Sequence, residues 1–135
     1  MGILNWFKKK SLFEENMEFA VSLKKGEFKS MRLIDLIHRI IERIREIDEH
    51  LKQYIDLTAI HEESPDNEAA RLELEKFGKK IGDVKKLVIL RNALVKIVKR
   101  LNQNLQKRVI EVQKKGKEEL RLEREKIRKL RINFK

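Results

Sequence analysis

The stretch LIDLIHRIIERIREIDEHLKQY, residues 33–54, carries the strongest structural pattern in the chain. Apolar side chains recur in it at alternating steps of four and three residues, the heptad pattern of a helix that packs against another helix. The positions of this seam are Leu33, Ile37, Ile40, Ile44, Ile47, Leu51 and Tyr54. The pattern predicts an amphipathic helix over residues 31–58, about 42 Å long at about 1.5 Å per residue, with Ser30 as its N-cap.

A second apolar stripe lies downstream and predicts a helix over residues 84–114, which begins after Asp83 as its N-cap. The stripe consists of Leu87, Leu94, Val98, Leu101, Leu105, Val109 and Val112. Two long helices of similar length joined through a short segment favour an antiparallel hairpin. We therefore expect an all-α protein, a small helical bundle built on a long, coiled-coil-like antiparallel hairpin with additional shorter helices.

Upstream of the hairpin, Ser11-Leu12-Phe13-Glu14 fits a capping box, in which the serine and glutamate side chains satisfy backbone N–H groups at a helix start. The helix that follows is predicted over residues 12–25, and Gly26 is a residue type that commonly ends a helix. We divide the chain into an N-terminal amphipathic segment with this helix, residues 1–28, and the hairpin with its basic C-terminal helix, residues 29–135.

The clearest break in the helical pattern is HEESPDN, residues 61–67. Ser64 as N-cap followed by Pro65 at the first helical position is a helix-start signal, and it predicts a short helix over residues 66–77. The glycines at positions 78 and 82 leave open whether this helix and the next are separate or form one kinked helix.

Charge is distributed unevenly along the chain, whose net charge is +11. Residues 1–78 contain 13 Lys/Arg and 16 Asp/Glu, a net charge of −3, whereas residues 79–135 contain 20 and 6, a net charge of +14. The C-terminal half therefore holds the whole positive excess. This asymmetry indicates an anionic partner, or pairing between the two halves within one chain or between copies.

Many of these cations follow helical spacing opposite the apolar stripe of the 84–114 helix, where they would form a ridge about 40 Å long. The basic C-terminal helix adds further cations. The residues that we expect to contact an anion or a nucleic acid are Lys85, Lys96, Lys99, Arg100, Lys107, Lys114, Arg128, Lys129 and Arg131.

The last segment of the chain mixes both signs of charge. Gly116 predicts a hinge or a mild kink at its start. Glu118 with Arg121, and Glu125 with Lys129, are spaced for favourable ion pairs along a helix. Part of this charge is therefore expected to stabilise the helix itself.

The sequence contains no motif typical of catalysis or metal binding. Because Cys is absent, disulfides and thiolate metal sites are excluded. His38, Glu42, Glu46 and His50 lie four residues apart, but their strip falls beside the seam, toward solvent, and the Glu-x-x-His pattern of bundle metal sites is missing. We expect no enzymatic activity, no cofactor, no metal and no small-molecule substrate.

The first residues give a different signal. Ile3, Leu4, Trp6 and Phe7 precede three lysines and form a short amphipathic element that suits a membrane surface or a partner, or that caps the apolar end of the bundle. No apolar run reaches the roughly 18 residues that cross a bilayer. We expect a cytoplasmic protein, or one bound peripherally to the inner face of the membrane.

These patterns predict a non-enzymatic helical scaffold or adaptor that acts through its basic ridge and apolar faces and associates with itself or with a partner helix. The first alternative is a protein that binds the backbone of duplex or structured nucleic acid; base stacking is not expected, because Phe134 is the only aromatic residue after Phe77. The second alternative is a peripheral membrane scaffold. The identity of the anionic partner and the oligomeric state stay open.

Overall fold

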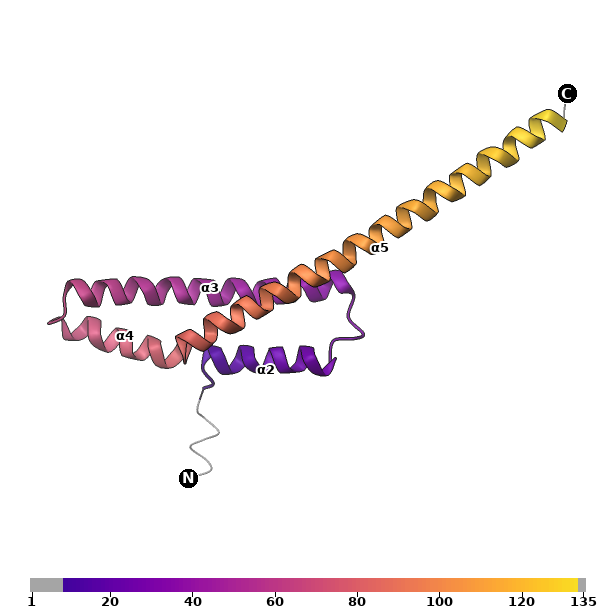
Figure 1. The fold of residues 1–135 in the computed structure, drawn as a ribbon. Helices are drawn as coiled ribbons and strands as arrows, with labels where there is room; N and C mark the ends of the chain where they lie inside the picture. The colour runs from indigo at the N-terminus through magenta and orange to yellow at the C-terminus, as the bar shows by residue number, and fades with distance from the viewer. Residues whose placement is uncertain (1–8, 134–135) are drawn as a thin grey trace. The chain divides into compact units, whose positions relative to one another are not determined.

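The computed structural model of the chain describes residues 9–133, with side chains described for residues 9–130. Within this range every regular element is an α-helix (Figure 1). The helices are α2 (Leu12–Lys25), α3 (Leu33–Glu63), α4 (Glu68–Ile81) and α5 (Val84–Asn133). The predicted all-α class and small helical bundle are confirmed.

The chain divides into two structural units, Met1–Lys99 and Arg100–Lys135. The first unit contains α2, α3, α4 and the first turns of α5, and it holds the buried apolar core. The second unit is the remainder of α5 over its described residues. The predicted division into residues 1–28 and 29–135 stays a prediction.

Helix α2 has the bounds that its local sequence predicts. The Glu14 backbone N–H donates a hydrogen bond to the Ser11 hydroxyl oxygen over 3.1 Å, which is the serine half of the capping box. At the other end Gly26 adopts a left-handed conformation with φ of 77°, and its N–H donates to the carbonyl oxygen of Leu23 over 3.1 Å. Both ends therefore follow from local hydrogen bonding.

Helix α3 begins later and ends later than the predicted 31–58. The prediction of Ser30 as N-cap was wrong: the N-cap is Arg32, without a capping side-chain hydrogen bond. The preceding residues are held in turns instead, in which the Met31 N–H donates to the Phe28 carbonyl over 3.1 Å. Residues 59–63 include no glycine or proline, so the helix continues to Glu63.

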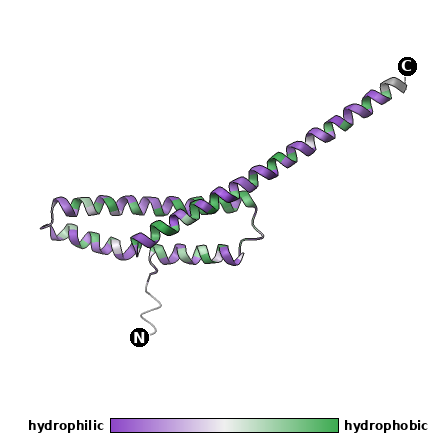
Figure 2. Ribbon diagram, viewed as in Figure 1, coloured by the Kyte–Doolittle hydropathy of each residue, from purple (hydrophilic) through white to green (hydrophobic). Residues whose placement is uncertain are grey.

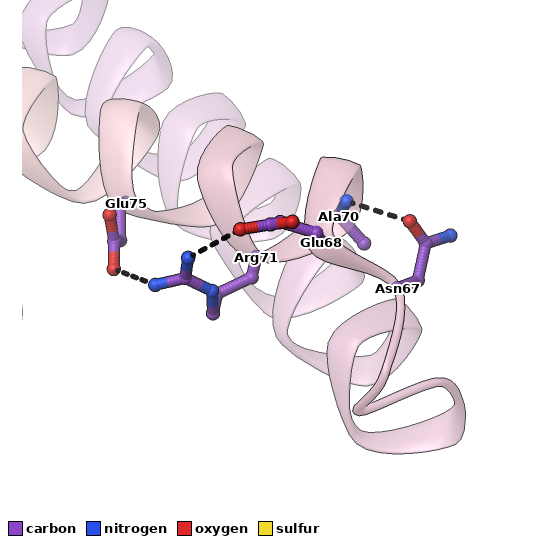
Figure 3. Close-up of polar contacts among 5 residues, drawn as sticks. All are labelled: Asn67, Glu68, Ala70, Arg71 and Glu75. Atoms are coloured by element: carbon purple, nitrogen blue, oxygen red, sulfur yellow. Dashed lines mark hydrogen bonds and ion pairs between the residues drawn. The ribbon is translucent and has the colours of Figure 1, made fainter.

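The connection between α3 and α4 uses a different cap from the predicted one. Ser64 ends α3, because its N–H donates to the Ile60 carbonyl over 3.1 Å, and Pro65 lies outside both helices. The N-cap of α4 is Asn67, whose side-chain oxygen accepts a hydrogen bond from the Ala70 N–H over 3.3 Å (Figure 3). The amide side chain therefore performs the role predicted for the serine.

Helices α4 and α5 are separate, which answers the question that the two glycines left open. Gly78 lies inside α4, whereas Gly82 ends it with φ of 91°. The Lys86 N–H then donates to the Asp83 carboxylate over 3.1 Å, so the predicted N-cap of α5 is confirmed. A Cβ at Gly82 would lie 2.8 Å from the Ser11 hydroxyl oxygen, which shows how closely the start of α2 approaches this turn.

The core of the first unit is assembled around α3. Helices α3 and α4 pack along each other, and α2 contacts α4. The buried apolar side chains are Leu12 and Phe19 from α2, Ile37, Ile40 and Ile47 from α3, Ala70, Phe77 and Ile81 from α4, and Leu87, Leu90, Leu94 and Val98 from α5. The three from α3 all belong to the predicted heptad seam. Removing such surface from water, at about 25 cal/mol per Å², is the main term that stabilises this unit.

The hairpin partner predicted for α3 was the helix after residue 84, but α3 packs mainly against α4. The first turns of α5 run antiparallel to the N-terminal half of α3 (Figure 1). There the Arg91 guanidinium donates two hydrogen bonds to the Asp48 carboxylate, over 2.8 and 3.1 Å. On the C-terminal half the His50 ring stacks on Phe77 of α4, with 5.9 Å between ring centroids. Helix α3 therefore contacts α4 and α5, and it also contacts α2, where the Arg43 guanidinium lies over the Phe19 ring.

Helix α5 does not end near residue 114, and Gly116, predicted as a hinge or a mild kink, does not interrupt it. The helix is continuous through this position to Asn133. A single interior glycine costs about 1 kcal/mol relative to alanine and does not by itself terminate a helix. The lysines and glutamates on both sides are good helix formers, so they carry the helix across the glycine.

Candidate interaction surfaces

The cations predicted to meet an anion fall in both structural units. Lys85, Lys96 and Lys99 lie in the first unit and are exposed. The exposed cations of the second unit are Arg100, Lys107, Lys114, Arg128 and Lys129. Arg131 belongs to α5, but its side chain lies outside the described residues. Among residues 9–130, none of the eight described cations takes part in an ion pair within the chain.

Within the second unit, Lys107 and Lys114 are seven residues apart and therefore share one helix face. Arg100 lies a further seven residues upstream on the same face. We call these three residues the basic face of the second unit. None of the three forms an ion pair within residues 9–130, although Glu111 lies between Lys107 and Lys114 on the same face, so all three are available to an anionic partner.

Arg121 is a paired cation of the second unit. Arg121 donates to Glu118, with a shortest distance of 2.6 Å, and to Glu125 over 3.1 Å. Hydrogen bonding and charge from Arg121 lower the pKa of Glu118, and the same contacts, led by Glu118, raise the pKa of Arg121. The predicted pair Glu118–Arg121 is confirmed, whereas Glu125 pairs with Arg121 rather than with Lys129. These exposed pairs stabilise the helix only slightly.

Arg91 is a cation whose role the sequence did not predict. Its guanidinium bridges α5 to Asp48 of α3 and is about one third exposed, and the hydrogen bond that it donates to Asp48 is the main cause that raises the pKa of Arg91. Its position was a usable signal, since Arg91 is four residues after Leu87 and three before Leu94, on the face that packs. A cation on an apolar face indicates a facing carboxylate.

Apolar side chains remain exposed along the second unit, where green and purple alternate along the ribbon of α5 (Figure 2). We define the C-terminal stripe as Leu101, Leu105, Val109, Val112, Leu120, Ile127 and Leu130. Its last five members have exposed fractions between 48% and 68%. No other helix belongs to this unit over its described residues, so nothing within the unit covers the stripe.

A hollow of about 750 Å³ lies in the first unit, beside the start of α2. Four lysines line it together with two carboxylates: Lys9, Lys10, Lys79, Lys80, Glu15 and Glu46. Lys10 is already paired with Glu18, and this contact raises the pKa of Lys10. The mixed signs around the rim give the hollow little selectivity for a charged ligand.

In the histidine strip on α3, His50 makes structural contacts. The Nδ1 atom of His50 lies 2.7 Å from the Glu46 carbonyl oxygen, and its ring stacks on Phe77. His38 is exposed. Among the residues that the structure describes, no group of three His, Asp or Glu side chains is arranged to hold a metal ion.

The N-terminal anchor residues Ile3, Leu4, Trp6 and Phe7 lie outside the described residues. No helix within residues 9–133 combines the length and the hydrophobicity that a membrane span requires.

Comparisons with protein-family models, with curated proteins and with solved structures give no match for this chain. Two surfaces of the second unit are suited to binding a partner. They are the exposed apolar C-terminal stripe and the basic face.

Proposed function

We propose that the chain is a non-enzymatic helical scaffold that self-associates through exposed apolar helix faces and meets an anionic partner through its basic residues. The observation that carries the proposal is the exposure of the C-terminal stripe. A lone amphipathic helix has no core in which to bury its apolar side, and continuous apolar surface of this kind marks an interaction site.

The magnitudes favour an association that depends on concentration. Each half-exposed stripe residue would gain on the order of 1 kcal/mol on burial, so five residues in each of two copies would gain on the order of 10 kcal/mol. Association itself costs an estimated ~4–15 kcal/mol in lost freedom of motion. Because the two quantities are comparable, we expect monomers and dimers to exchange within the range of ordinary protein concentrations.

The basic face supports the second half of the proposal. Arg100, Lys107 and Lys114 share a face whose single carboxylate, Glu111, forms no ion pair within residues 9–130, so positive charge is in excess there. Such a surface attracts anions, and the attraction weakens as salt shortens the screening length.

Light scattering of the full chain across a range of concentrations tests the self-association. The expected result is an apparent mass that rises from the 16.2 kDa of one chain toward a multiple of it. A mass that stays at 16.2 kDa at every concentration would contradict the proposal, because the apolar stripe would then be stable in water.

A nucleic-acid backbone is the second candidate partner, favoured by exposed cations without accompanying aromatic rings. Contacts to phosphates alone do not require base stacking, and their strength falls steeply with salt. Gel retardation with a random-sequence DNA duplex should show a shift at low salt that disappears at high salt. The variant K107Q/K114Q should weaken that shift, and no shift at low salt would exclude this partner.

Peripheral membrane scaffolding stays a prediction, because its proposed anchor at Trp6 and Phe7 lies outside the described residues. Co-sedimentation with anionic liposomes, with and without residues 1–10, tests it. Binding that is unchanged by the deletion would show that the anchor is wrong.

A further inference from the structure

We infer that two copies of the chain pair antiparallel along the C-terminal stripe, with the two Gly116 residues at the crossing point. The inference rests on the proposed self-association and adds the interface, the direction and the register. Three independent observations carry it: the symmetry of the stripe, the glycine at its centre, and the placement of unpaired carboxylates along its edge.

The stripe is almost symmetric about Gly116. Four residues away on either side lie Val112 and Leu120, and eleven residues away lie Leu105 and Ile127. Leu101 and Leu130 close the stripe fifteen residues before and fourteen residues after the glycine. A two-fold axis at Gly116 therefore sets Val112 of one copy against Leu120 of the other, and an apolar residue meets an apolar residue at both ends.

The spacing keeps these residues on one side of the helix. From Leu105 to Ile127 the steps are four, three, four, four, three and four residues, an 11-residue repeat of about 3.67 residues per turn. This is close to the about 3.6 residues per turn of a straight α-helix. Two such helices can stay in contact over their length with little supercoiling.

Gly116 lies at the centre of the stripe, and no contact within its own chain requires a glycine there. It lies inside α5, and a Cβ built on it meets no atom within 4 Å. Neither a turn nor internal packing explains a residue that weakens the helix here. The absence of a side chain lets a second backbone approach closely, and this is the place where two symmetric helices would cross.

The carboxylates next to the stripe select the antiparallel direction. Glu118 and Glu125 pair with Arg121 on the far side of the helix, whereas Glu119 and Glu123 form no ion pair within residues 9–130. Glu123 lies in the line of the stripe itself, seven residues after Gly116. A parallel pair would bring Glu123, which lies in the line of the stripe, against its own copy, which is repulsive.

In the antiparallel register the same carboxylates face cations. Glu123 comes to the level of Val109 of the second copy, beside its Arg108, and Glu119 comes within about one helical turn of its Lys115. Arg108 and Lys115 are exposed, on the same edge as the two glutamates, and unpaired within the described residues. Lys126 shares this edge, and its exposed ammonium group can extend to solvent. The symmetry repeats every favourable contact twice, so charge and apolar pattern favour the same arrangement.

Spin-label distances on the full chain test the register, because the sequence contains no cysteine that would interfere. Gln103 and Lys129 lie thirteen residues on either side of Gly116 and outside the stripe. In the antiparallel pair, Q103C labels are separated by about 39 Å along the helix axis, at about 1.5 Å per residue, and K129C labels likewise. Mixing the two labelled proteins should give a new short distance, since position 103 of one copy lies beside position 129 of the other.

Each outcome decides the inference. Long distances in both single-label samples with a short distance in the mixture support it. Short distances in the single-label samples would show a parallel pair and overturn it. A dimeric mass in light scattering without a distance between these labels would place the interface elsewhere; the inference would then fail while self-association stands. A monomeric mass would overturn the inference and the proposed self-association together.

Discussion

Gly82 is a residue whose type is required by both its conformation and its surroundings. Its φ of 91° strains any residue with a side chain, and an added Cβ would meet the Ser11 hydroxyl at 2.8 Å and the Phe13 Cβ at 3.1 Å. We expect Gly82→Ala to lower the free energy of unfolding by about 1–3 kcal/mol.

Urea denaturation followed by circular dichroism measures this effect, and Gly78→Ala is the matched control. Gly78 lies inside α4, and a Cβ there meets nothing within 4 Å, so alanine should stabilise the helix by about 0.5–1 kcal/mol. Equal effects of the two substitutions would contradict the close approach of α2 to the turn at Gly82.

The ion pair between Glu118 and Arg121 predicts a specific dependence on pH. Because Arg121 lowers the pKa of Glu118 in the folded helix, the pair stabilises the helix above the ordinary value of 4.5 and loses this contribution as the pH falls through the lowered pKa. An NMR titration of the Glu118 carboxyl should therefore give a midpoint below 4.5.

Arg121→Gln should return the Glu118 midpoint to its ordinary value, because it removes both the hydrogen bond and the charge. A midpoint that is the same in both proteins would show that the two side chains are apart in solution.

Some helix caps could be predicted from the sequence and others could not. The prediction failed where the capping residue lies in a turn or at the end of another helix. Ser11, Gly26 and Asp83 act as their local sequence predicts, since each bonds to a backbone group within four residues. Ser30 and Ser64 have the same chemistry, yet one lies in a turn and the other ends a helix. At both positions the neighbouring residues offer competing backbone hydrogen bonds. The pattern of residue types alone does not show which of these hydrogen bonds forms.

Among the elements, α3 shows what periodicity predicts and what it leaves open. Its heptad seam correctly predicted a long packed helix, and Ile37, Ile40 and Ile47 of that seam are buried. The seam did not predict that α4 would be the main partner of α3. Apolar stripes of similar width are interchangeable partners in a sequence, and only chain connectivity and close packing choose between them.

One substitution in α5 should have opposite effects on the stability of the helix and on the affinity of the dimer. Gly116→Ala should raise the stability of the isolated helix by about 0.5–1 kcal/mol, because alanine is the better helix former. In the antiparallel pair the new methyl groups would meet at the crossing point, so the dimer dissociation constant should rise several-fold.

Hydrogen exchange of the amides around position 116 measures the first consequence of Gly116→Ala, and sedimentation equilibrium measures the second. A dimer that becomes tighter with alanine would show that the two backbones do not approach each other at this glycine.

Across the whole chain, the two structural units differ in the burial of their apolar side chains. The first folds around buried isoleucine and leucine side chains, whereas the second exposes its apolar residues next to a net positive charge. The asymmetry of charge was visible in the sequence from the start. The difference in burial between the two units was not visible there. Periodicity alone does not distinguish an apolar stripe that the chain covers from one that it leaves exposed.

Matched variants separate the two faces of the second unit. L120Q/I127Q removes two apolar side chains of the C-terminal stripe, and K107Q/K114Q removes two cations of the basic face. All four positions are exposed, and glutamine is a good helix former, so circular dichroism should show unchanged helix content in both variants.

Sedimentation equilibrium of the natural chain and these two variants, at matched concentration and salt, tests whether the stripe holds two copies together. We predict that the natural chain and K107Q/K114Q reach twice the 16.2 kDa mass of one chain, whereas L120Q/I127Q remains at 16.2 kDa. A stripe variant that associates as strongly as the natural chain would contradict the account.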